Sequence, residues 1–293
     1  MEKTLLVLAA GMGSRFGGLK QIEPVGPNGE FIIDYSIYDA IRSGFTKVVF
    51  VIKEENLEIF ENTVGKRIKN HIKVEYAFQK MDDIPCEVPE GRIKPWGTGH
   101  AIYSAINYIN EPFAVVNADD FYGYDAYKVL NEFLDKASGA GLVGYELEDT
   151  LSKNGAVKRG IIFHNNHNVT DIIESSCEMD DKGILCTPLN GSTPFYANKE
   201  NKAGMSIYGF QPDFLKLVKS ELNEFVKTAN LEKDEYLMPD IIDKYIKMGN
   251  KVELLSTTAH WIGMTYKEDL DYIKNEINDY IKEGVYPNNL WED

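Results

Sequence analysis

Residues 6 to 21 read LVLAAGMGSRFGGLKQ, and this stretch decides how the first part of the chain folds. The apolar run that begins at Thr4 is unbroken, which is typical of a strand buried on both faces of a parallel sheet. It ends in a glycine-rich loop that carries Arg15 and Lys20. Glycines let backbone N–H groups approach a ligand closely, and the two cations can neutralise an anion. The stretch therefore predicts a phosphate-binding loop after the first strand.

Two later segments repeat the pattern of a buried strand, KVVFVIK at 47–53 and PFAVVNADD at 112–120. Helical patterns lie between these runs, and further strand patterns occur at 73–79 and 141–148. Strands that alternate with helices indicate an open parallel sheet with helices on both faces. We therefore expect an α/β, Rossmann-like fold with a mostly parallel, mixed sheet.

The middle of the chain has a different composition. Residues 153–201 are rich in Asn, Gly, Asp and Ser, and their short strand-like pieces predict a small β-hairpin insertion. After it we expect a buried strand, two helices, another strand and a final helix at 267–283. No internal repeat or low-complexity linker divides the chain, so the sequence predicts one domain over residues 1–293.

Composition and charge exclude several classes of function. The formal net charge is -15, with 31 basic and 46 acidic residues interspersed, which disfavours binding to a nucleic-acid backbone. No apolar run approaches the roughly 18 residues that span a bilayer, and no signal peptide is recognisable. Three cysteines without a CxxC pair give neither a disulfide framework nor a zinc site. We expect a soluble, cytoplasmic protein that binds no membrane, and its oligomeric state stays open.

Two common phosphate loops do not fit the first stretch. A Walker loop needs GxxxxGK[ST], but Lys20 is followed by Gln21. A dinucleotide-binding loop needs GxGxxG opening into a helix, but Phe16 occupies the third glycine position and prolines and glycines follow soon after. An ATPase of this type and a dehydrogenase are both disfavoured.

The loop instead resembles the signature of the sugar-phosphate nucleotidyltransferase family, a first strand followed by LAAGxGxRF and then a lysine. The matching residues are Leu8, Ala9, Ala10, Gly11, Gly13, Arg15, Phe16 and Lys20. The resemblance implies a Rossmann-like fold of the GT-A type. It also implies that Leu8 to Gly11 and Gly13 line the nucleotide, and that Arg15 and Lys20 act in catalysis. The short FGGL between Arg15 and Lys20 is more compact than in many relatives.

Two further segments match nucleotide-binding positions of that family. In WGTGHAI, residues 96–102, Gly97 and Thr98 occupy the turn that opens a helix beneath the base and ribose. Gln79, at the end of the strand KVEYAFQ, matches the position that often contacts the base edge. A glutamine at a strand end can equally be an ordinary surface residue.

The third segment is VVNADDFYG. A buried strand that ends in two aspartates places carboxylates at the ligand-binding edge of an open α/β sheet. Mg²⁺ is typically held by one or two carboxylates together with phosphate oxygens and water. By the resemblance, Asp119 is the metal ligand and Asp120 a supporting or alternative ligand. The pair can also cap the helix that follows.

The acceptor half carries weaker signals. Glu174 matches a family glutamate that binds sugar hydroxyls, and Gly160 a glycine that lets the backbone approach the sugar. The lysine that often follows the glutamate is replaced here by Ser175. Lys153, Lys158 or Arg159 can supply that charge from the adjacent strand. Near the end of the chain Trp261 is kept, but Gly263 stands where relatives have an acidic second metal ligand.

The resemblance implies a Mg²⁺-dependent enzyme that joins a nucleoside triphosphate to a sugar 1-phosphate or similar phosphorylated acceptor and releases pyrophosphate. Residues 1–125 would form the nucleotide-binding half and 126–293 the acceptor-binding half. Three alternatives remain open: a phosphocholine cytidylyltransferase, a GT-A glycosyltransferase, and a nucleotide-binding protein without catalysis. The protein without catalysis remains possible because Gly263 replaces an acidic metal ligand and Ser175 replaces a lysine. The sequence does not specify which base is bound.

Overall fold

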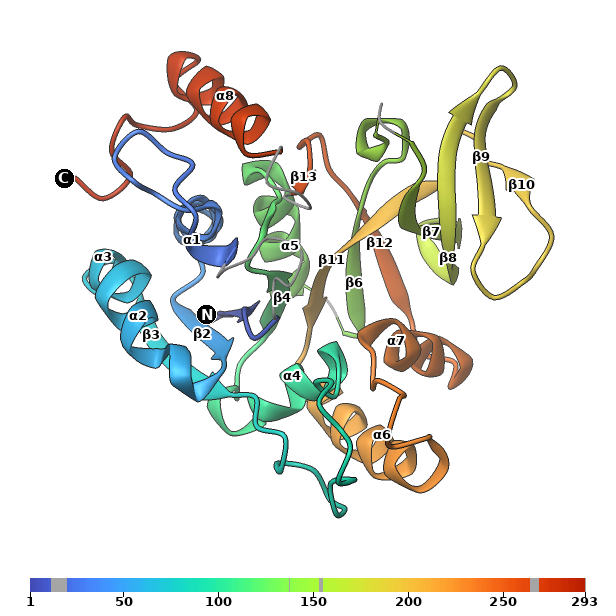
Figure 1. Ribbon diagram of the computed structural model, residues 1–293. Coiled ribbons are helices and arrows are strands. Elements are labelled where there is room, and N and C mark those ends of the chain that lie inside the picture. Colours follow the sequence, from blue (N-terminus) through green and yellow to red (C-terminus); the bar gives the residue numbers. More distant parts are fainter. Residues whose placement is uncertain (12–19, 137, 153–154, 264–268, 293) are drawn as a thin grey trace.

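A large mixed sheet runs through the centre of the computed structural model, which describes residues 1–11, 20–136, 138–152, 155–263 and 269–292 (Figure 1). Within these residues the sheet has 11 strands. Gly13, Arg15 and Lys153 lie outside the described residues, and of Lys20 only the backbone, in a short 3₁₀ turn, is described.

The first half of the chain forms the parallel part of the sheet. Its order is β3–β2–β1–β4, and all three neighbouring pairs are parallel. The side chains of β1 alternate between two cores: Leu5 and Val7 pack on one side and Leu6 on the other. Burial on both faces explains why the strand is continuously apolar. The strands are β1 (Thr4–Leu8), β2 (Lys47–Ile52), β3 (Lys73–Phe78) and β4 (Phe113–Asn117).

The direction of pairing changes at β11 (Lys202–Phe210). This strand lies antiparallel between β4 and β6 (Ala140–Glu146), and β12 (Val252–Ser256) then runs parallel to β6. The mixed α/β sheet predicted from the sequence is confirmed. Parallel pairing is concentrated in the first half, because β11 returns from the insertion and enters the sheet in the opposite direction.

The insertion predicted at 153–201 is present and contains more than one hairpin. β7 and β8 pair over most of their length, and β9 and β10 extend the sheet outward from β8 (Figure 1, right). A tight turn at Asn166 and His167, both with positive φ, joins β7 to β8. The strands are β7 (Val157–Asn165), β8 (Asn168–Asp180), β9 (Gly183–Pro188) and β10 (Phe195–Tyr196).

Helices cover both faces of the sheet. α1 (Ile32–Ser43) and α5 (Tyr124–Lys136) share one core with β1 and β2, while α4 (Thr98–Ser104), α6 (Phe214–Thr228) and α7 (Met238–Lys247) share the opposite core. α1 ends, as its sequence predicts, at Gly44 in a left-handed conformation. The remaining helical segments are α2 (Leu57–Phe60), a π-helical turn (Glu61–Gly65), α3 (Lys66–Ile68), α8 (Asp269–Lys282) and the 3₁₀ turns Lys20–Ile22, Glu54–Asn56, Ile106–Tyr108 and Glu148–Thr150.

The C-terminal segment returns to the first helix. The Tyr286 hydroxyl donates to Asp39 Oδ2 (2.7 Å), and Trp291 Nε1 donates to Asp34 Oδ1 (3.1 Å). Both aspartates are fully buried on α1, and this burial raises the pKa of Asp34 to about 6 and that of Asp39 to about 7. The C-terminal segment is therefore part of the core around α1.

Among the described residues, none of the helices is both long enough and apolar enough to traverse a lipid bilayer.

Candidate active site

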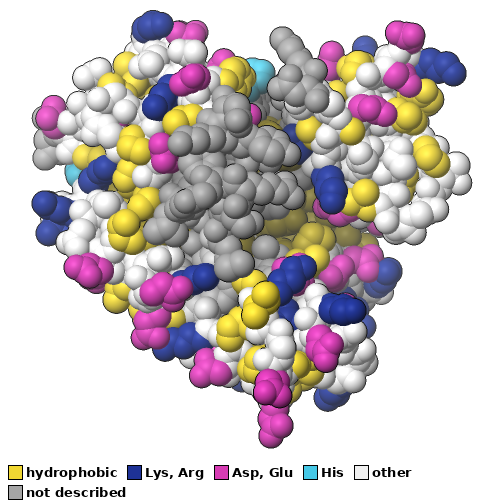
Figure 2. All heavy atoms as spheres, viewed as in Figure 1, with side chains coloured by type: hydrophobic (Ala, Val, Ile, Leu, Met, Phe, Trp, Pro, Cys, Tyr) yellow, Lys and Arg dark blue, Asp and Glu magenta, His cyan; other side chains and the backbone are white. Residues whose placement is uncertain are grey.

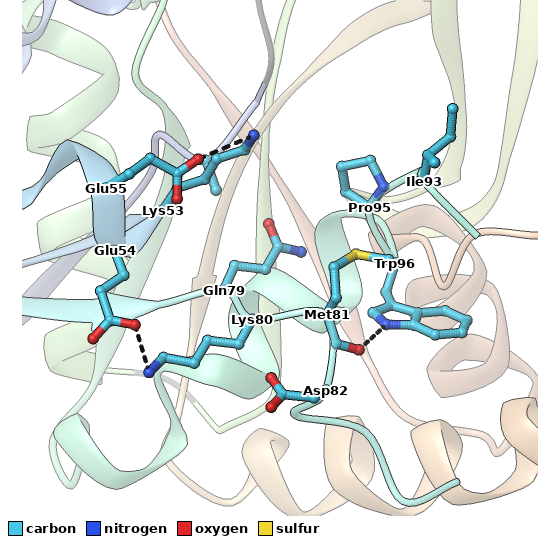
Figure 3. Close-up of a pocket in the computed structure, with 11 residues that line it drawn as sticks. Lys53, Glu54, Glu55, Gln79, Lys80, Met81, Asp82, Ile93, Pro95 and Trp96 are labelled. Atoms are coloured by element: carbon cyan, nitrogen blue, oxygen red, sulfur yellow. Dashed lines mark hydrogen bonds and ion pairs between the residues drawn. The ribbon is translucent and has the colours of Figure 1, made fainter. Parts of the chain in front are cut away.

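A cavity of about 430 Å³ opens at the carboxyl ends of β2 and β3. Its walls come from Ala10 after β1, from Lys53 after β2, and from the segment that follows β3 (Figure 3). This is the edge of the sheet at which open α/β folds bind ligands. Ala10 and Gln79, both predicted to contact nucleotide, line the cavity together.

Gln79 is held in one orientation. Its Nε2 donates to Gly97 O (3.0 Å) and lies 3.3 Å from Nδ1 of His100, while Nε2 of His100 lies 2.7 Å from Asp83 O. A carbonyl oxygen only accepts, so Nε2 of His100 carries the proton and Nδ1 accepts from Gln79. Burial lowers the pKa of His100, which favours this neutral form. Because both N–H donors of Gln79 are engaged, it presents an acceptor oxygen to the cavity.

The wall opposite Gln79 is fixed by Arg92. This side chain is 6% exposed, and its guanidinium donates to four backbone carbonyls, those of Lys94, Pro95, Leu231 and Asp234. Its Cζ lies 3.6 Å from the ring centroid of Trp96, whose Nε1 donates to Met81 O (2.8 Å). An arginine with its donors satisfied in this way stiffens the segment between β3 and α4.

Gly97 and Thr98 connect this wall to α7. Gly97 has φ +101°, and an added Cβ would lie 2.6 Å from Tyr236 O. The Thr98 hydroxyl accepts from Met238 N (2.9 Å), at the first residue of α7. The structure thus gives both residues a packing role at the rim of the cavity, and their predicted contact with the nucleotide stays a prediction.

Replacement of Gly97 by alanine is expected to lower the free energy of unfolding by about 2–4 kcal/mol, because the new Cβ adds both backbone strain and a clash with Tyr236. Urea unfolding measures this change. Gly91→Ala is the matched control: Gly91 is exposed, an added Cβ meets nothing within 4 Å, and its effect should stay within about 0.5 kcal/mol. Equal effects of the two substitutions would contradict the packing role.

The glycine-rich loop begins beside the cavity. Ala9 N donates to Val51 O (2.8 Å) and Leu8 O accepts from Ala118 N (3.1 Å), so the chain continues the line of β1 between its neighbours. Gln21, which is buried, donates through Nε2 to Gly11 O (3.1 Å). Gly11 and Gln21, on either side of the loop, are therefore joined.

The two aspartates lie at the end of β4. Asp119 is in the turn that leaves the strand, and Asp120 begins β5 (Asp120–Phe121). Asp120 Oδ2 accepts from Asn117 Nδ2 (3.0 Å) and from the Tyr122 hydroxyl (3.3 Å). β5 pairs with β13 (Ile262–Gly263), and Gly263 stands directly opposite Asp120. The residue predicted to replace an acidic ligand is thus beside the predicted metal site.

Trp261 explains why position 263 is glycine. An added Cβ on Gly263 would lie 2.3 Å from the Trp261 ring and 3.2 Å from Asp120 Oδ1. The indole occupies the space in which a carboxylate side chain would begin. Within the described ranges no cluster of three or more His, Cys, Asp or Glu side chains forms a metal site. The oxygen donors present, two carboxylates, suit Mg²⁺, which takes few protein ligands and completes its shell with phosphate and water.

The residues predicted to bind the acceptor come together on β7 and β8. Gly160 pairs with Glu174, and an added Cβ on Gly160 would lie 3.1 Å from Glu174 Oε1. Desolvation raises the pKa of Glu174, opposed by the positive charges of Arg159 and Lys158. Ser175 is fully buried and donates to Ile173 O (3.1 Å), so its hydroxyl points away from solvent.

Arg159 stands directly opposite Ser175 in the β7–β8 pair. Its Cζ lies 4.9 Å from the Trp261 ring centroid, and its backbone partners are Thr150 O and Lys158 O. Burial lowers the pKa of Arg159, while the negative charges of Asp120 and Glu174 act in the opposite direction. Lys153 lies outside the described residues, and of the other two cations considered from the sequence Arg159 is the partly buried one on which the charges of both Asp120 and Glu174 act.

The space-filling view shows a hollow between the parallel half and the insertion, floored by apolar side chains (Figure 2). The structure brings Ala10 and Gln79 to one rim of the sheet, and the negative charges of Asp120 and Glu174 both act on Arg159. His100 and Arg92 were missed by the sequence reasoning. The position of His100 directly after WGTG was the one sequence feature that indicated a place near the nucleotide-facing turn. No sequence feature indicated the role of Arg92, because two of its partners are distant backbone carbonyls.

Comparison with known proteins decides the family. The sequence profile of the family described as nucleotidyl transferase matches residues 4–286. This chain belongs to the nucleotidyl transferase family. The match covers both halves of the sheet, in agreement with the resemblance seen in the first loop.

Solved structures similar to this nucleotidyltransferase share its fold at low sequence identity. The inositol-1-phosphate CTP transferase from T. maritima has a TM-score of 0.68 at 16% identity, covering 97% of each chain. A UDP-glucose pyrophosphorylase complexed with UDP-glucose has a TM-score of 0.63 at 19% identity, covering 95% of this chain and 99% of the other. A UDP-glucose pyrophosphorylase from Acinetobacter baumanii has a TM-score of 0.62 at 15% identity, covering 97% and 99%.

Proposed function

We propose that this nucleotidyltransferase joins a nucleoside triphosphate to a sugar 1-phosphate, or a similar phosphorylated acceptor, and releases pyrophosphate. One observation carries the proposal: the cavity lined by Gln79 and the aspartate pair both lie at the carboxyl ends of parallel strands, and Arg159 and Glu174 are neighbours in the adjoining β7–β8 pair. The names of the similar structures, which refer to inositol 1-phosphate and to UDP-glucose, are consistent with this acceptor class.

At the nucleotide end of the reaction, the protein would hold the base in a fixed orientation. Gln79 would offer an acceptor to the base, and the wall fixed by Arg92 would hold the base against it. Arg15 and Lys20 would neutralise the triphosphate and the leaving pyrophosphate. Little covalent chemistry falls to the protein in phosphoryl transfer, so positioning and charge neutralisation supply the acceleration.

At the acceptor end, Glu174 would accept hydrogen bonds from hydroxyl groups, and Arg159 would bind the phosphate that attacks the α-phosphorus. Asp119 and Asp120 would hold Mg²⁺, which when bound neutralises charge between nucleotide and acceptor phosphate. The chain is then a Mg²⁺-dependent enzyme with two anionic substrates.

The proposed reaction is tested by measuring pyrophosphate release from each of four nucleoside triphosphates with Mg²⁺ and with glucose 1-phosphate, inositol 1-phosphate or phosphocholine. Pyrophosphate should form only when triphosphate and acceptor are both present, together with a nucleotide-linked product of the expected mass. A glycosyltransferase would instead consume a nucleotide sugar without forming pyrophosphate. A silent nucleotide-binding protein would show binding and no product.

Arg159→Gln is expected to raise KM for the acceptor at least about tenfold, because the glutamine keeps a donor to Thr150 O but removes the charge that meets the phosphate. KM for the triphosphate should change less than about twofold. Lys158→Gln is the control, since it removes a charge of the same sign from the neighbouring, exposed position on β7. If Lys158→Gln has the larger effect on acceptor KM, Arg159 is not the phosphate ligand.

A further inference from the structure

Ser206 has an unusual backbone conformation. Among the described residues other than glycine, only Asn166, His167 and Ser206 have a positive φ. Asn166 and His167 form the tight turn between β7 and β8, where such angles are normal. Ser206 has φ +59° inside β11, a conformation that serine adopts at a cost and glycine adopts freely. Such an outlier is a reason to look for a function at that position.

Ser206 lies where the pairing of β11 changes. The register of β11 shifts between Gly204 and Tyr208: Gly204 pairs with Gly160 on β7, and Tyr208 pairs with Val115 on β4. Ser206 lies midway, where β11 passes from the end of β4 to the insertion. The pairing with β4 stops at Tyr208, opposite Val115, so Ser206 lies in the irregular stretch just beyond it, near the end of β4, which leads to the turn that carries Asp119.

The side chains around Ser206 show which face of the sheet it is on. Met205 and Ile207 both belong to the core on the α1 and α5 side, and Tyr208 belongs to the opposite core. The negative charge of Glu174 also contributes, after burial, to raising the pKa of Tyr208. Ser206 therefore shares its face with Tyr208 and Glu174.

The hydroxyl of Ser206 is open to a ligand. The residue is partly exposed, and no hydrogen bond to its hydroxyl is found within the part of the chain that the structure describes. Gly160 and Gly204, which pair beside it, carry no side chains that would fill the space in front. A hydroxyl can both donate and accept, as a partner for another hydroxyl must.

We propose that Ser206 is a specificity-determining residue that hydrogen-bonds a hydroxyl group of the acceptor. This rests on the proposed function and narrows it: the acceptor is a polyhydroxylated phosphate, a sugar or cyclitol phosphate, and not a quaternary-ammonium phosphate such as phosphocholine. The strained backbone conformation positions the hydroxyl toward the ligand between Glu174 and the aspartate pair.

The experiment compares Ser206→Gly with Ser206→Ala in the acceptor-dependent pyrophosphate assay and in thermal unfolding. Ser206→Gly removes both strain and hydroxyl, so its Tm should rise by about 2–4 °C while KM for the polyol acceptor rises about tenfold. Ser206→Ala keeps the strain, so KM should rise to a similar extent without a gain in Tm. KM for the triphosphate should stay within about twofold in both variants.

His167→Gly is the matched control, because it relieves the same kind of strain in the distant β7–β8 turn. It should raise Tm and leave acceptor KM unchanged. The proposal is overturned if Ser206→Gly keeps acceptor KM within about twofold of the wild type, or if the wild type uses phosphocholine better than every polyol phosphate. Failure of the proposed function looks different: the wild-type protein itself would then release no acceptor-dependent pyrophosphate.

Discussion

Replacement of Asp119 by asparagine is expected to reduce turnover at least about 100-fold, the loss of a transition-state contact of about 3 kcal/mol. The substitution conserves shape and removes the charge that would bind Mg²⁺ beside the triphosphate. The measurement is the initial rate of pyrophosphate release with both substrates and Mg²⁺ at saturation. Isothermal titration of Mg²⁺ into the complex with a non-hydrolysable triphosphate should show weaker metal binding.

Asp120→Asn is the informative comparison. Asp120 already accepts hydrogen bonds from Asn117 and Tyr122 and pairs with Gly263 through its backbone, so its carboxylate has a structural role next to the site. We expect a smaller fall in turnover, about tenfold, accompanied by a loss of stability. If Asp120→Asn abolished Mg²⁺ binding while Asp119→Asn retained near-normal turnover, the two ligand roles would have to be exchanged.

Arg15→Ala is expected to lower turnover by two or more orders of magnitude, because the guanidinium would stabilise the charge that develops on the departing pyrophosphate. This expectation comes from the sequence motif, since Arg15 lies outside the described residues. Single-turnover rates with saturating triphosphate measure the chemical step directly. Arg15→Lys should retain part of the rate, because it keeps the charge and loses the bidentate geometry.

Lys69→Ala serves as the control for Arg15→Ala, since it removes one positive charge from an exposed position just after α3. Its turnover should match that of the unmodified protein. A near-normal rate for Arg15→Ala at saturating triphosphate would show that the cationic loop only assists binding. The catalytic role would then pass to Lys20 or to the metal.

Several strands and one helix end could be predicted because each depends on a short run of neighbouring residues. The unbroken apolar runs predicted β1, β2 and β4, and Gly44 marked the end of α1. The aspartates after β4 were expected at the edge of the sheet because all parallel strands end on the same side. The direction of β11 and the size of the insertion could not be predicted in the same way, since strand pairing depends on register between distant segments.

The same limit applies to the site. The sequence offered Lys153, Lys158 and Arg159 as candidates for one charge. Lys153 lies outside the described residues, and the pairing of Arg159 with Ser175 distinguishes Arg159 from Lys158. Arg92 binds backbone carbonyls of Leu231 and Asp234, more than 130 residues away, which no local pattern records. Ser206 was not recognised either, because the sequence alone does not show that this serine has a positive φ.

The return of the C-terminal segment to α1 has a consequence for how this protein is made. Tyr286 and Trp291 reach aspartates that lie 247 and 257 residues earlier in the chain. At about 5–20 residues per second, a ribosome needs roughly 12–50 s to synthesise that length. During this time Asp34 and Asp39 lack these two hydrogen-bond donors, so this part of the core can be completed only after the segment that carries Tyr286 and Trp291 has been synthesised.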